Sequence, residues 1–101
     1  MAYESAHFDA NLAAAAGGDP ALQAELRAAF GESVRQQCDL LRRSRCDANW
    51  LMAAWRLKGL GATFHAGGLV ELAEEALDGA PGDPVVLRKL DVFAQQVSAA
   101  S

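Results

Sequence analysis

The run AAWRLKGLGATFHAGGL at residues 53–69 is the most informative part of the chain, because its apolar residues repeat with helical spacing. At about 100° per residue, one stripe of this helix collects the side chains expected to face a core. They are Trp50, Ala53, Leu57, Leu60 and Phe64. The opposite side of the same helix is also apolar, with Trp55 at its centre. The helix therefore has a core face and a second apolar face that needs its own explanation.

A second apolar face is either covered by another part of the chain or kept for a partner. Around Trp55 on that side lie Leu51, Met52, Gly59 and Ala62. Glycine costs about 1 kcal/mol in a helix interior relative to alanine. Gly59 and the nearby Gly61 therefore indicate that something comes close to the helix backbone. Helix packing within the fold and docking of a partner would both account for them.

The composition predicts a single all-α domain over residues 1–101. With 101 residues and 51% hydrophobic residues, the chain can bury a core without disulfides or a metal. Leu and Ala dominate and Ile is absent, which favours helix over strand. Cys38 and Cys46 lack the His or Cys neighbours of a zinc site, so we expect reduced, structural thiols.

Charge and hydropathy exclude several classes of function. A net charge of -4 and a pI near 5.0 give no general attraction to nucleic acid. No apolar run approaches the ~20 residues that span a bilayer, and residues 1–4 lack the basic start of a signal peptide. Since catalytic triads, phosphate loops and metal-ligand spacings are also missing, we expect a soluble cytoplasmic protein that is no enzyme and needs no cofactor.

The remaining chain predicts four long helices after a short one at residues 8–16, which Gly17 and Gly18 stop. Asp19-Pro20 and Asp83-Pro84 each combine a capping aspartate with a proline in the first turn, and so begin the second and last helices. We expect Asp47 to cap the third helix, which ends near residues 65–68, and residues 79–82 to break the fourth. Short loops between long helices predict an antiparallel four-helix bundle with a short additional N-terminal helix.

The motif helix resembles the histidine phosphotransfer domains of bacterial two-component phosphorelays, which carry His-x-Leu-Lys-Gly on an exposed helix face. The matching run here is residues 55–59, with Ala54 before it and Phe64, Ala66 and Leu69 after it. The resemblance extends over the whole helical layout, including the Gly-Gly-Asp-Pro-Ala-Leu entry to the second helix and the acidic fourth helix. The match fails at the residue that does the chemistry, because Trp55 stands where the family has its phosphorylated histidine.

The resemblance implies a docking surface without a phosphoryl carrier. The family needs an imidazole that attacks a phosphoaspartate and a cation that steadies the phosphoryl oxygens. Indole has no lone pair available for this attack, whereas Lys58 and Gly59 remain where the family keeps its cation and the room for an incoming domain. The expected partner is a receiver domain or a histidine kinase. We expect this chain to be a monomer and to bind the partner through seven of its own residues. They are Leu51, Met52, Trp55, Arg56, Lys58, Gly59 and Ala62.

Four alternatives stay open. His65, which occupies a position where the family often has glycine, could accept the phosphoryl group, although it lies roughly 15 Å further along the helix than Trp55. The chain could instead be a helical adaptor unrelated to phosphorelays, or self-associate through the exposed stripe, because fold does not fix function. A carrier whose histidine has been substituted would show the same motif. His7 is expected to be an ordinary surface residue.

Overall fold

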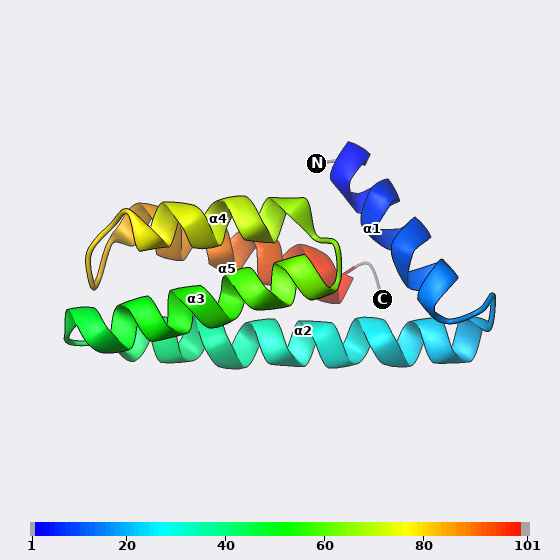
Figure 1. Cartoon of the computed structure of the whole chain (residues 1–101), viewed down its shortest axis with the longest axis horizontal. Coiled ribbons are helices and arrows are strands. Elements are labelled where there is room, and N and C mark those ends of the chain that lie inside the picture. Colours follow the sequence, from blue (N-terminus) through cyan, green and yellow to red (C-terminus); the bar gives the residue numbers. More distant parts are fainter. Residues whose placement is uncertain (1, 100–101) are drawn as a thin grey trace.

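The computed structural model describes the backbone of residues 2–99 and the side chains of residues 8–98, so the prediction for the His7 side chain lies outside it. This part of the chain forms five α-helices (Figure 1). They are α1 (Ala2–Ala15), α2 (Pro20–Arg43), α3 (Asp47–Thr63), α4 (Gly67–Leu77) and α5 (Pro84–Ala99). Over these residues, no helix is both long enough and apolar enough to cross a bilayer.

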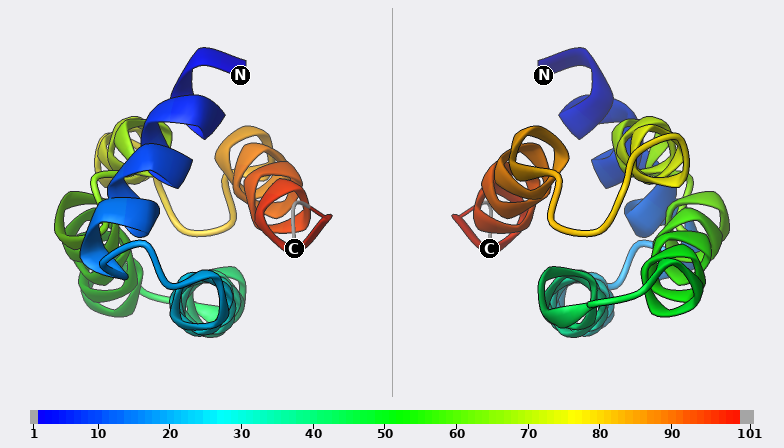
Figure 2. Two further views of the ribbon diagram at one scale, coloured as in Figure 1. Left: turned by 90° about the vertical axis from the view of Figure 1, so that its right-hand side faces the viewer. Right: turned by 90° about the vertical axis from the view of Figure 1, so that its left-hand side faces the viewer.

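Helices α2 to α5 form a closed antiparallel bundle, which confirms the predicted fold. Each packs against two others: α2 and α4 both lie between α3 and α5. Figure 2 shows the four helices end-on around one interior. The additional helix α1 begins earlier than predicted, at Ala2, and packs mainly on the N-terminal half of α2, at one end of the bundle (Figure 1).

The two predicted Asp-Pro helix starts are present, but the predicted start of α3 is wrong in detail. The Asp19 carboxylate accepts the backbone N–H of Ala21 at 2.9 Å, and the Asp83 carboxylate accepts that of Val85 at 3.0 Å. In α3, Cys46 is the N-cap residue and makes no side-chain capping bond. Asp47 is already helical, so its charge favours the helix through the positive N-terminal dipole rather than through a cap.

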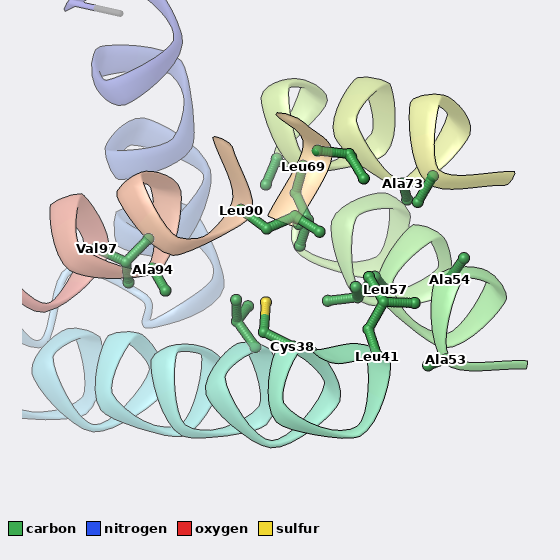
Figure 3. Close-up of a cluster of buried hydrophobic side chains, with 14 of the residues drawn as sticks. Cys38, Leu41, Ala53, Ala54, Leu57, Leu69, Ala73, Leu90, Ala94 and Val97 are labelled. Carbon is green, nitrogen blue, oxygen red and sulfur yellow. The ribbon is translucent and has the colours of Figure 1, made fainter. Parts of the chain in front are cut away.

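All five helices contribute to one apolar core, and Figure 3 shows part of it. Its largest fully buried side chains come from the four bundle helices: Phe30, Val34 and Leu41 of α2, Trp50 and Leu57 of α3, Leu69 of α4, and Val86 and Leu90 of α5. In α1, Phe8 and Leu12 are buried, and the Phe8 ring lies 4.9 Å from that of Phe30. The core fixes the rotation of α3, and this rotation decides which of its residues reach the surface.

Candidate functional site

The inner face of α3 is the predicted core stripe. Trp50, Ala53 and Leu57 are buried, and Leu60 and Phe64 are partly buried against the same core. The Trp50 indole Nε1 donates a hydrogen bond to the Ala76 carbonyl at 2.7 Å, which ties α3 to the end of α4. Trp50 is thus a structural residue whose polar atom is satisfied.

The outer face of α3 carries an apolar surface. Trp55 is 57% exposed, Met52 47% and Leu51 39%. Gly59 and Ala62 are exposed on the same side. We call these five residues the Trp55 surface. Arg56 is exposed at its edge, and Lys58, at the opposite edge, is half-buried. All seven residues predicted to bind a partner therefore lie together on one outward-facing side of one helix.

The two glycines of α3 have different surroundings. A Cβ atom on Gly61 would lie 2.8 Å from Val70 Cγ2 and 2.9 Å from the Val70 backbone nitrogen, so this glycine allows the start of α4 to pack closely. A Cβ on Gly59 would meet nothing within 4 Å. Packing within the fold explains Gly61 but not Gly59, which leaves the helix backbone accessible beside Trp55.

Lys58 is held by two neighbours. Its Nζ lies 3.2 Å from Glu74 Oε2 of α4 and 5.0 Å from the centroid of the Trp55 ring. The carboxylate and the indole together hold the ammonium group against the edge of the Trp55 surface. In the sequence, Glu74 is one of several acidic residues of the fourth helix, with nothing that links it to Lys58. The antiparallel pairing of α3 with α4 was the signal that could have linked Glu74 to Lys58.

His65 is not on the motif helix, contrary to the predicted helix end near residues 65–68. Helix α3 ends at Thr63, and His65 adopts φ 57° in the turn to α4, with its side chain exposed. Its N–H donates to the Ala62 carbonyl at 3.3 Å, and the N–H of Ala66 donates to the Gly61 carbonyl at 2.7 Å. These two bonds are those of a Schellman helix stop, whose left-handed position is usually glycine.

The residues of the Trp55 surface and its edges are apolar or positively charged. Among the described residues, no group of three or more His, Cys, Asp or Glu side chains could hold a metal ion. Arg56 takes part in none of the ion pairs of residues 8–98, so its charge is available to a partner. An apolar centre with one free cation at its edge is the anatomy of a protein-binding surface.

No protein-family model, curated protein or solved structure matches this chain. The residues of α3 and their geometry are therefore the basis on which a function can be inferred.

Proposed function

We propose that this chain is a phosphotransfer-like domain without its histidine, which docks a receiver domain or a histidine kinase and inhibits phosphoryl flow by occupying the docking site. The observation that carries the proposal is the 57% exposure of Trp55 on an outward-facing apolar surface, at the motif position where a carrier has its histidine. A large exposed aromatic amid apolar neighbours is a typical interface anchor.

The contacts around Trp55 support docking over phosphoryl transfer. Open space at Gly59 leaves room for a partner beside the indole. Lys58 already contacts Glu74 and the Trp55 ring within the fold, so its ammonium group is not left unpaired for a phosphoryl group. Indole offers no nucleophilic nitrogen. The expected effect on signalling is competition, in which the chain covers the surface that a true carrier would use.

A labelling experiment tests the absence of a carrier. The chain is incubated with receiver domains phosphorylated by radiolabelled acetyl phosphate, beside an ordinary histidine phosphotransfer domain as positive control. The positive control should become labelled and this chain should not. Stable, acid-labile label on the chain would contradict the proposal.

The His65→Gly variant makes the labelling experiment specific. Glycine removes the imidazole and suits the left-handed backbone at this position, where alanine would be strained. If wild-type chain takes up label and His65→Gly does not, His65 is the phosphoacceptor and the chain is a true carrier. If the wild-type chain neither takes up label nor binds any receiver domain or kinase, the docking proposal is wrong, and an adaptor for another class of partner or self-association is left.

A further inference from the structure

A cavity lies between α4 and α5 and reaches α1, and none of its lining residues belongs to the Trp55 surface. Its volume is about 560 Å³, and residues of α1, α2, α4 and α5 line it. Small-molecule sites in proteins usually enclose about 300–1,000 Å³ and are mostly apolar with a few polar groups. The cavity is therefore of a size and position that suit a small ligand.

Much of the wall is apolar. Phe8 of α1, Leu72 of α4 and Val92 and Phe93 of α5 line the cavity. Val92 is 46% exposed, although it is a large apolar residue next to Phe93, which packs against the core. Burying such surface against a hydrocarbon chain or ring is favourable by about 25 cal/mol per Å². An apolar ligand body would cover what the fold leaves exposed here.

The cavity is lined by more carboxylates than cations. Arg27 pairs with Asp9 across α2 and α1, and Lys89 Nζ lies 3.0 Å from Glu75 Oε1 across α5 and α4. Glu71 also lines the cavity, one turn before Glu75, and forms no ion pair within residues 8–98. Both cations are thus already matched by carboxylates, and one carboxylate is left over.

We propose that this cavity binds a small amphiphilic amine, with its apolar body against Phe8, Leu72 and Val92 and its ammonium group at Glu71. An ammonium would form a charge-assisted hydrogen bond with the Glu71 carboxylate. An anionic amphiphile of the same length would have to compete with Asp9 or Glu75 for a cation and would be repelled by Glu71. The charge of the ligand head is therefore the selective feature.

The probe series is octylammonium, octanoate and octanol, each titrated into the full chain at pH 7 and followed by calorimetry and by amide chemical shifts. We expect saturable octylammonium binding with shifts on α4, α5 and α1, and affinity at least about tenfold lower for octanoate. Trp55→Ala should leave this binding unchanged, which separates it from the docking function. Equal or tighter octanoate binding, shifts confined to the Trp55 surface, or no saturable binding at millimolar octylammonium would each overturn the proposal.

Two pairs of variants place the ligand. Glu71→Gln should lower octylammonium affinity about tenfold, whereas Asp78→Asn, which removes an exposed charge at the other end of α4, should not. Val92→Trp should fill the cavity and abolish binding, while Val85→Trp, at another exposed valine of α5 outside the lining, should leave it intact. Equal effects within either pair would show that the cavity is not the binding site.

Discussion

Trp50 and Trp55 are on the same helix but have opposite surroundings. The Trp50 side chain is buried and its indole nitrogen is bonded to Ala76, whereas Trp55 is exposed and contacts Lys58. Helical phase alone predicts this difference, because the two residues differ by about 140° around the helix axis. The sequence thus distinguishes a structural tryptophan from a candidate anchor.

The stability of alanine variants tests this difference. Trp50→Ala should lower the free energy of unfolding by about 3–5 kcal/mol, because it opens a core cavity and removes the partner of the Ala76 carbonyl. Trp55→Ala should lower it by about 1 kcal/mol or less, the size of the lost contact with Lys58. Urea denaturation of both variants measures this, and an equal loss would mean that Trp55 belongs to the core.

Gly59 and Gly61 should respond in opposite ways to replacement by alanine. Gly59→Ala should raise the free energy of unfolding by about 0.5–1 kcal/mol, because the site is open and alanine is the better helix former. Gly61→Ala should lower it by about 1–3 kcal/mol, since the new methyl group would overlap the Val70 backbone. The same urea titrations decide this, and a destabilising Gly59→Ala would show that α3 is packed closely there by the fold itself.

At the scale of the element, the turn after α3 shows why His65 has a structural cost. A residue other than glycine in the left-handed region is disfavoured by about 1–2 kcal/mol, and His65 has φ 57° there. The equivalent position after α1 is held by Gly17, with φ 62° and the same pair of hydrogen bonds, from Gly17 to Ala14 and from Gly18 to Ala13. Helices α1 and α3 therefore end in the same way, with glycine at the left-handed position after α1 and histidine after α3.

His65→Gly should stabilise the fold by about 1 kcal/mol, and the melting temperature should rise by about 4–8 °C. Gly17→Ala is the reverse control and should lower the melting temperature, because it introduces a Cβ atom into the left-handed conformation. Thermal melts followed by circular dichroism measure both. A lower melting temperature for His65→Gly would mean that the imidazole makes a stabilising interaction that outweighs the backbone strain.

In the whole molecule the two thiols differ in burial, and only the Cys38 thiol reports on the state of the core. The Cys38 side chain points from α2 into the core (Figure 3), whereas Cys46 is exposed. Burial raises the pKa of the Cys38 thiol to about 11 from the ordinary 9.0; Arg42 acts in the opposite direction and Asp91 adds to the rise. Cys38 is therefore a neutral thiol at physiological pH and reacts only when the fold opens.

The raised pKa of Cys38 makes stability depend on alkaline pH. Below about pH 9 the thiol is protonated in both states and its contribution to stability is fully present. Between about pH 9 and 11 the unfolded chain releases the proton and the folded chain keeps it, so stability falls as pH rises. The urea midpoint should decrease from pH 8 to pH 10 in both proteins, and the decrease should be larger for wild type than for Cys38→Ala. An equal fall in both proteins would show that Cys38 does not contribute.

The spacing of apolar residues and the two Asp-Pro starts were enough to predict the bundle, because each acts within one helix or at one of its ends. The prediction failed where the outcome depends on a single backbone conformation or on a neighbouring helix. Cys46 rather than Asp47 became the N-cap residue, and α3 stopped before His65. No feature of α3 alone indicates that Gly61 faces Val70 while Gly59 faces open space, or that Glu74 pairs with Lys58.

Titration of purified receiver domains and histidine kinases into this chain measures whether Trp55 anchors either of them. Trp55→Ala is compared with wild type and with Val85→Ala, a control at 55% exposure outside the Trp55 surface. Trp55→Ala should weaken binding by at least about 2 kcal/mol, roughly 30-fold, while Val85→Ala binds as wild type does. A folded Trp55→Ala protein that binds its partner with unchanged affinity would show that Trp55 is not the anchor.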